Sequence, residues 1–263
     1  MLSIRRLAIC TTGYDTAHES VADQVQTKIA DLCAALDHQN VEISVFIGDD
    51  GSDPFFAPAA RAGAARIPEV PTLIVPTTST STRGRKGKAL RAALAAAVSS
   101  TPTPDAFVYL NLNLKVPARC VAAAVTRARA HRSLGGVDVV VGSRSPRDGG
   151  TAKGTGAIGA LKSRVWSSVA HAALPQLRTF ADPNAPLKLM SERAARMIVS
   201  EGNIDGVGFD AEWLCLWLRA GLRVATIPMV WEQRAGSRPP WELVPEMLSE
   251  LAQTRRKVGS PPV

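Results

Sequence analysis

The sequence predicts an α/β fold in which a mostly parallel sheet is flanked by helices. Short apolar runs alternate along the chain with segments of helical periodicity, of which Val21, Val25, Ile29, Leu32 and Leu36 form one example. Turn residues follow most of the apolar runs, and this alternation is typical of βαβ units. Hydrophobic residues make up 46% of the 263 residues. That content is enough for a substantial core, so a disordered chain is excluded.

The predicted elements follow one another as strand and helix in turn. Strands are predicted at Leu7–Cys10, Val41–Ile47, Thr72–Val75, Ala106–Leu110, Val137–Val141 and Leu222–Ile227. Helices are predicted at Val21–Leu36, Lys88–Val98, Pro117–Ala130, Ala160–Leu174, from a Ser191 cap to about Ser200, at Asp210–Ala220 and at Trp241–Val258. Residues 145–159 contain five glycines without apolar periodicity, which favours a mobile loop. No element is predicted for Phe180–Lys188, which contains two prolines.

The net charge of the chain limits the classes of binding partner that it suits. There are 31 Lys and Arg against 23 Asp and Glu, which gives a net charge of +8. Such an excess suits nucleic acid, a membrane surface or an anionic small molecule. Nucleic acid is disfavoured, because aromatic residues make up only 5% of the chain and no stacking motif is present. The cysteines and histidines lack metal-ligand spacing, so a zinc hydrolase gains no support.

The hydropathy of the chain bears on its location. No apolar run approaches the ~20 residues of a transmembrane helix. The first residues also lack the long apolar segment of a signal peptide. We therefore expect a cytoplasmic protein.

Polar segments follow several predicted strands, at the edge where parallel sheets bind ligands. Asp49–Asp53 can accept hydrogen bonds from a nucleobase or ribose, and the alternative is a solvated turn. Arg83–Arg91 carries five positive charges and opens a helix, which suits a phosphate or diphosphate. The alternative there is a solvated basic loop. In Asn111–Lys115 polar residues alternate with leucines, which by itself indicates no more than a strand end.

Together these segments resemble family 2 glycosyltransferases of the GT-A fold, and most of all the dolichyl- and polyprenyl-phosphate sugar synthases. The resemblance covers nearly the whole chain. Its motifs are a degenerate nucleotide turn at Thr11–Asp15, the DDGS of Asp49–Ser52, Lys86-Gly87-x-Ala89, Gly142–Arg144, Arg164, Asp182 with Leu187–Leu189, Phe209-Asp210-x-Glu212, and Ile227–Trp231 followed by Arg234 and Ser237.

The resemblance implies inverting transfer of a sugar from a UDP- or GDP-sugar to a polyprenyl phosphate or a small-molecule acceptor. It implies a single GT-A domain over residues 1–258, with a nucleotide-sugar-binding half (1–144), an acceptor-binding half (145–258) and a tail (259–263). The donor-binding residues that the resemblance implies are Thr11, Asp15, Asp49, Asp50, Lys86, Asn111, Asn113 and Arg144. The residues that it implies for binding the acceptor or a phosphate are Arg164, Lys188 and Arg234. The alternative is that these basic side chains are simply solvated at the surface.

The chain departs from the family at the metal site. Family members carry Asp-x-Asp after the fourth strand, where it binds Mg²⁺ or Mn²⁺ on the donor diphosphate, but here these positions are Asn111 and Asn113. An amide is a poor divalent ligand compared with a carboxylate. Lys115 stands two positions further on, and we hypothesise that its ammonium replaces the cation as counter-charge for the leaving diphosphate. The alternative is a catalytically inactive relative that binds a nucleotide or nucleotide-sugar.

The acceptor decides whether a general base is needed. A polyprenyl phosphate is already an anion, whereas a hydroxyl acceptor needs a carboxylate within hydrogen-bond reach. Asp182 is the leading candidate, followed by Asp210 and Glu212, although Glu212 fits a structural role nearly as well. Because the chain shows no C-terminal transmembrane helices, a lipid acceptor would require peripheral docking through Arg255–Lys257 and the 145–159 segment.

Overall fold

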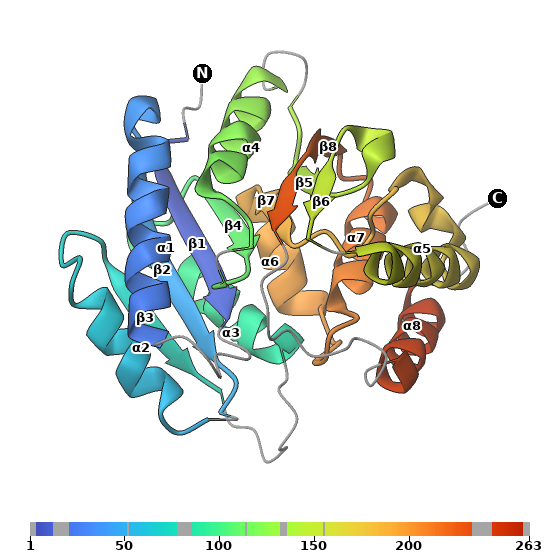
Figure 1. Ribbon diagram of the computed structural model, residues 1–263, viewed down its shortest axis with the longest axis horizontal. Helices are drawn as coiled ribbons and strands as arrows, with labels where there is room; N and C mark the ends of the chain where they lie inside the picture. Colours follow the sequence, from blue (N-terminus) through green and yellow to red (C-terminus); the bar gives the residue numbers. More distant parts are fainter. Residues whose placement is uncertain are drawn as a thin grey trace.

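The computed structural model describes residues 4–12, 21–51, 53–77, 86–113, 115–131, 136–154, 156–232 and 244–259 (Figure 1). Its strands are β1 (Arg6–Thr12), β2 (Glu42–Asp49), β3 (Thr72–Pro76), β4 (Ala106–Leu110), β5 (Val139–Ser143), β6 (Thr151–Lys153), β7 (Leu187–Met190), β8 (Val224–Pro228) and β9 (Val230–Glu232). Its helices are α1 (Val21–Leu36), α2 (Phe56–Ala64), α3 (Lys86–Val98), α4 (Ala118–His131), α5 (Gly156–Ala173), α6 (Glu192–Glu201), α7 (Phe209–Arg219) and α8 (Val244–Val258).

The main sheet has the strand order β3-β2-β1-β4-β7-β5-β8. Every neighbouring pair in it is parallel except those of β7, which runs antiparallel to both β4 and β5. Helices α1, α2 and α4 cover one face, and α3, α6 and α7 cover the other (Figure 1). The predicted α/β fold with a mostly parallel sheet is therefore confirmed.

The strands separate two apolar cores because successive side chains point to opposite faces of a sheet. In β4, Phe107 and Tyr109 enter the core under α3 and α7, whereas Val108 and Leu110 enter the core under α1 and α4. All five residues of β4 are buried. A strand buried on both faces reads as one continuous apolar run, as this one does in the sequence.

Close backbone packing joins β2 to α3. A Cβ on Gly48 would lie 2.1 Å from the main-chain oxygen of Ala89, so only glycine fits at this position. The residues after Gly48 and those before Ala89 are thereby brought to one edge of the sheet. Gly48, which precedes the Asp49–Ser52 motif, is small because β2 and α3 approach each other so closely at Ala89.

The structure corrects the sequence-based interpretation in several places. The 145–159 segment is not the predicted mobile loop, because it contains a 3₁₀ turn at Pro146–Asp148, strand β6 and the start of α5. Strand β6 pairs in parallel with β9 in a small second sheet. Strand β7 was missed because its four residues are all buried and follow two prolines, so no alternating pattern marks it.

Helix α2 was also not predicted from the sequence. Within the described residues, no helix combines the length and the hydropathy that crossing a bilayer requires.

Candidate active site

The ends of β1 and β2 lie side by side, since Thr12 is in register with Gly48. Thr11 is buried in β1, and in the described part of the chain its hydroxyl has no hydrogen-bond partner. Asp49 Oδ1 accepts the N–H of Gly51 at 2.9 Å, and Asp50 is buried next to it. Three predicted donor-binding residues are thus brought together at this edge, while Asp15 lies outside the described residues.

Helix α3 begins against the turn between α6 and α7. The N–H groups of Gly87 and Lys88 donate to the carbonyls of Gly206 (3.2 Å) and Asp205 (3.1 Å). A Cβ on Gly87 would lie 2.4 Å from the carbonyl oxygen of Ile204. These main-chain donors are therefore used within the protein, which differs from our expectation that a phosphate would bind at this helix N-terminus.

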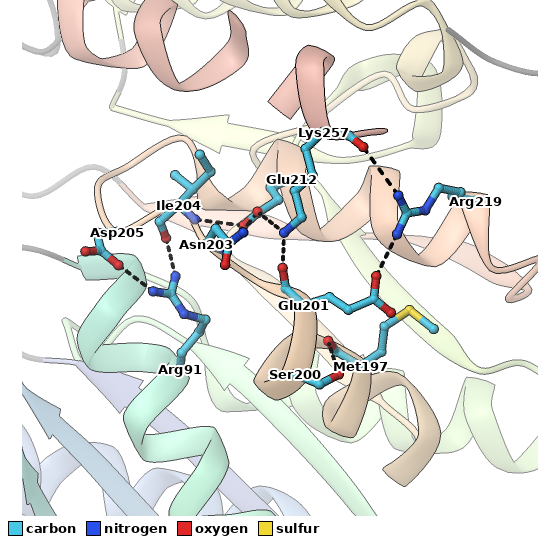
Figure 2. Close-up of polar contacts among 10 residues, drawn as sticks. All are labelled: Arg91, Met197, Ser200, Glu201, Asn203, Ile204, Asp205, Glu212, Arg219 and Lys257. Carbon is cyan, nitrogen blue, oxygen red and sulfur yellow. Dashed lines mark hydrogen bonds and ion pairs between the residues drawn. The ribbon is translucent and has the colours of Figure 1, made fainter. Parts of the chain in front are cut away.

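The basic side chains at the start of α3 point in different directions. Lys86 Nζ lies 5.4 Å from the ring centre of Tyr109 and 5.5 Å from that of Phe209. Arg91 instead binds the Ile204 carbonyl and the Asp205 carboxylate (Figure 2). Lys86 is thus a described member of this basic segment that reaches the site, and Arg83 and Arg85 lie outside the described residues.

Arg144, which follows β5, is paired with Asp182. Its Nε and Nη2 atoms donate to the two carboxylate oxygens at 2.7 Å each, and its main-chain N–H donates to Oδ2 at 2.9 Å. Burial alone would raise the pKa of Asp182, but the Arg144 guanidinium and its hydrogen bonds outweigh burial and lower that pKa. A lowered pKa makes Asp182 a weaker base than a free carboxylate.

Lys188 reaches the same edge because β7 runs antiparallel, so that its first residues lie where the parallel strands end. Lys188 is in register with Tyr109 on β4 and Val141 on β5. Its fully buried ammonium donates to the carbonyl of Ala185 (2.6 Å) and forms an ion pair with Asp210. Burial lowers the pKa of Lys188, and the ion pair only partly offsets that effect.

Four cations converge here, and we call Lys86, Lys115, Arg144 and Lys188 the cationic cluster. Burial lowers the pKa of Lys86 to about 8, and the charges of Lys188, Arg144 and Lys115 add to the decrease while Asp210 opposes it. Each of these charges therefore lies within electrostatic range of Lys86. The two carboxylates of the site, Asp182 and Asp210, leave the cluster with an excess of positive charge.

Trp231 connects two members of the cationic cluster. The ring centre lies 5.7 Å from Lys115 Nζ and 5.3 Å from Arg144 Cζ, both within the range of a cation–π contact. The carbonyl of Lys115 also accepts the N–H of Glu232 at 2.9 Å, so strand β9 is tied to the segment after β4. The small sheet that the sequence analysis missed is therefore what brings Trp231 to the site.

The two asparagines after β4 do not fit a divalent cation. Asn111 Oδ1 accepts a hydrogen bond from the Tyr109 hydroxyl at 3.2 Å. The Asn113 amide oxygen is buried, with no hydrogen-bond partner in the described ranges. Neither amide carries a charge, and no group of three His, Cys, Asp or Glu among the described residues is arranged to hold a metal.

The remaining predicted site residues are placed elsewhere. Glu212 is fully buried, and its carboxylate accepts the N–H groups of Asn203 (2.9 Å) and Ile204 (3.0 Å) and pairs with Lys257 at 3.1 Å (Figure 2). These contacts favour the structural role of Glu212, which the sequence analysis left open beside a catalytic one. Arg164 is exposed on α5 and makes none of the contacts described above, and Arg234 lies outside the described residues.

Tyr109 and Trp231 lie within the sequence motifs, but the motifs predict no role for them. Their signal in the sequence is weak, because an aromatic residue in an apolar strand is more often a core residue. Burial raises the pKa of Tyr109 well above its usual value, so its hydroxyl stays protonated and able to donate to Asn111.

The comparisons with known proteins agree with the fold. No protein-family model matches the chain, and no curated protein matches it. Solved structures of glucosyl-3-phosphoglycerate synthase from Mycobacterium tuberculosis are similar. The complex with Mn²⁺, UDP-glucose and glycerol 3-phosphate has a TM-score of 0.65 at 18% identity, over 98% of this chain and 82% of that one. The complex with Mn²⁺, UDP and glucosyl-3-phosphoglycerate has a TM-score of 0.62 at 19% identity, over 98% and 81%.

Likeness at this identity shows the fold alone. The chain has a GT-A-like α/β fold, so the fold implied by the sequence motifs is confirmed. Membership of family 2, or of the polyprenyl-phosphate sugar synthases, is not shown.

Proposed function

We propose that this chain is a glycosyltransferase that takes a sugar from a nucleotide-sugar donor, with UDP- and GDP-sugars as the first candidates. The observation that carries the proposal is the cationic cluster, whose members come from α3, the segment after β4, the end of β5, and β7. An excess of positive charge at the carboxyl ends of parallel strands suits a diphosphate. The similar structures, which contain UDP and UDP-glucose, support the same donor class.

The donor would lie across the edge formed by β1, β2 and β4. Thr11, Asp15, Asp49 and Asp50 would hold the base and ribose. Lys86, Asn111, Asn113 and Arg144 would hold the diphosphate, with Lys115 at the leaving group. In this arrangement residues 1–144 mainly bind the donor and residues 145–258 mainly bind the acceptor, with Lys188, Arg164 and Arg234 near its phosphate.

We propose that the transfer needs no divalent cation. The donor set after β4 is two uncharged amides beside four cations, which repels Mg²⁺ or Mn²⁺. Lys115 and Lys86 can instead neutralise the charge that develops on the diphosphate as the bond to the sugar breaks. No step of the reaction then requires a metal.

The acceptor would be an anion. Asp182 is bound by Arg144, Asp210 by Lys188, and Glu212 by main-chain N–H groups, so each carboxylate that we considered as a general base is already engaged. A phosphate oxygen needs no base, because it is ionised before it attacks. It would form the new bond to the anomeric carbon as the nucleoside diphosphate leaves, with inversion. A polyprenyl phosphate and a small phosphorylated metabolite share this chemistry.

A second candidate is a protein that binds a nucleotide or nucleotide-sugar without transferring the sugar. The contacts of Asp182, Asp210 and Glu212 favour this second candidate as well, because a hydroxyl acceptor would then have none of these three carboxylates as a general base.

A thermal-shift screen with UDP-, GDP- and dTDP-sugars, each with Mg²⁺ and with EDTA, tests the proposal. We expect stabilisation in EDTA, and donor consumption when undecaprenyl phosphate or glycerol 3-phosphate is added, with the anomer of the product read by NMR. Stabilisation without consumption on any acceptor supports the binding protein, and no response to any nucleotide excludes both functions.

Lys115 is tested by substitution. Lys115→Ala should lower turnover about 100-fold, the size of the loss when one preorganised electrostatic contact is removed. Arg119→Ala removes an exposed cation on α4 and serves as the matched control. Turnover in EDTA that is equal for Lys115→Ala and the unmodified protein would contradict the role of this lysine.

A further inference from the structure

The turn between α6 and α7, residues 203–208, lies between the cationic cluster and the C-terminal helix. On one side, its Gly206 and Asp205 carbonyls accept the first N–H groups of α3. On the same side, the turn leads directly into Phe209 and Asp210, which contact Lys86 and Lys188. The position of this turn therefore affects two members of the cationic cluster at once.

One carboxylate of α8 holds this turn. Glu250 Oε1 accepts the N–H of Gly206 at 2.9 Å, and Oε2 accepts the N–H of Gly208 at 2.7 Å. A Cβ added at Gly206 would come within 2.2 Å of the Glu250 carboxylate, and one at Gly208 within 2.8 Å. Glycine at both positions thus permits the approach of the carboxylate.

Other contacts hold the remainder of the turn, and Figure 2 shows them. Glu212 binds the N–H groups of Asn203 and Ile204, and Arg91 binds the Ile204 carbonyl and the Asp205 carboxylate. Lys257 joins Glu212 to the carbonyl of Glu201. Glu250 instead binds the peptide group between Asp205 and Gly206, whose carbonyl accepts the Lys88 N–H, and the N–H of Gly208 at the start of α7.

The charge of Glu250 is itself costly at this position. Burial raises its pKa, and the nearby carboxylates of Glu246 and Asp205 raise it further, while the N–H groups of Gly208 and Gly206 lower it. A charged acceptor forms stronger hydrogen bonds than a neutral one. The two main-chain N–H groups are what make a carboxylate suitable here.

We propose that Glu250 is a positioning residue for the donor site, because its two oxygens fix the segment that sets Lys86 through α3 and Asp210 through the start of α7. The inference rests on the proposed function, since it assigns the C-terminal helix a part in binding the donor diphosphate. Glu250 itself touches no member of the cationic cluster through any contact described above. Its effect on the donor is transmitted through Gly206 and Gly208.

The first test needs no ligand. Glu250→Gln exchanges one acceptor oxygen for an NH₂ group that faces a main-chain donor, and amide hydrogen exchange is followed in the peptide spanning residues 86–91. We expect the Gly87 and Lys88 amides to exchange at least about fivefold faster, because their acceptor carbonyls lose their support. Glu246→Gln is the matched control: it removes the same charge one turn earlier, from a carboxylate that also lies beside Gly206, but in the described part of the chain the N–H groups of Gly206 and Gly208 donate to Glu250 and not to Glu246. Equal exchange in the two variants overturns the proposal.

The second test measures UDP affinity by calorimetry. Glu250→Gln should weaken UDP binding about tenfold, a size typical of coupling through packed neighbours. The UDP affinity of Glu246→Gln should be close to that of the unmodified protein. In a Lys86→Met background the Glu250→Gln substitution should cost less UDP affinity, because one of the two groups that it positions is gone. Equal losses in both backgrounds would show a general structural effect and overturn the proposal.

Two results separate this inference from the proposed function. If Glu250→Gln does not fold, Glu250→Asp keeps the charge but is too short to reach both N–H groups, and the same two measurements apply. If the unmodified protein binds no UDP or other nucleotide, the proposed function fails, and the exchange rates alone decide whether Glu250 holds α3.

Discussion

The cationic cluster and the turn at residues 203–208 both gather charged groups in a largely buried setting, yet they neutralise them differently. In the turn, Glu212 and Glu250 accept main-chain N–H groups, and Arg91 donates to a carbonyl as well as to a carboxylate. In the cluster, four cations face two carboxylates, and aromatic rings lie beside them. The carboxylates of Glu212 and Glu250 have hydrogen-bond donors within the chain, whereas the four cations of the cluster outnumber its two carboxylates.

Breaking the buried pair in the cluster should have the largest effect. Lys188→Met leaves the Asp210 carboxylate buried without its ammonium partner, which should lower the free energy of unfolding by about 3–5 kcal/mol. Urea denaturation measures the loss. Arg196→Met, which breaks an exposed pair with Glu192 on α6, should cost about 0.5 kcal/mol or less. Similar losses in the two variants would contradict the structural weight that we give to the Lys188–Asp210 pair.

Filling the close contact between α3 and the turn should have the next largest effect. In Gly87→Ala the new Cβ meets the Ile204 carbonyl oxygen, so backbone must move, at a cost of about 1–3 kcal/mol. Because Lys86 moves with α3, UDP should also bind more weakly. Gly221→Ala is the control, since its φ of +68° makes a side chain costly far from the site. It should lower stability and leave UDP affinity unchanged, and an equal effect of both on affinity would argue against the link between the turn and the cluster.

The pH dependence of the cluster follows from Lys86. Its pKa is lowered from 10.5 to about 8, so Lys86 is charged below pH 8 and the affinity for UDP should fall as the pH rises through that value. In the unliganded protein the sign is opposite: between pH 8 and 10.5 the unfolded chain binds more protons at Lys86 than the folded chain does. The contribution of this group to stability therefore rises with pH over that window. Calorimetry measures the pH dependence of UDP affinity, and urea denaturation measures that of stability, in the unmodified protein and in Lys86→Met. Both pH dependences should be lost in the variant. If they persist, Lys86 is not their source.

Removing the aromatic face beside the cluster should have the smallest effect. Trp231→Leu takes away cation–π contacts with Lys115 and Arg144, each of about 0.5–1 kcal/mol at a partly exposed position. UDP affinity should fall between about threefold and tenfold if Trp231 orients these cations. Trp231→Phe keeps a ring and should recover most of the loss, and a larger loss for Phe than for Leu would point to a different role.

Much of the fold was predictable because it depends on local patterns. The alternation of apolar runs and helical segments indicated the parallel strands and most helices, and the rule that ligands bind at strand ends located Asp49, Asp50, Asn111 and Arg144 at one edge. Strand β7 carries no such pattern, since all four of its residues are buried between β4 and β5. Its antiparallel direction, which brings Lys188 to the site, could not be predicted for the same reason.

The roles of individual carboxylates were less predictable than their positions. The motifs around Asp182, Asp210 and Glu212 predict candidate bases at these positions. Each has a partner distant in the sequence: Arg144, Lys188, and the Asn203–Ile204 amides together with Lys257. Whether a carboxylate is a base or one half of an ion pair depends on what lies beside it after folding.

The sequence by itself determined the α/β architecture, the edge of the sheet where the candidate site lies, and the presence there of Asn111 and Asn113 with Lys115 nearby. These properties are local, because they depend on residue type and spacing along the chain. Only the tertiary structure decided that β7 and β9 bring Lys188 and Trp231 beside that edge, that the candidate bases are already engaged, and that Glu250 supports the turn behind the site. Such pairings join residues far apart in the chain, and burial and electrostatic attraction select them only once the sheet and its helices have packed.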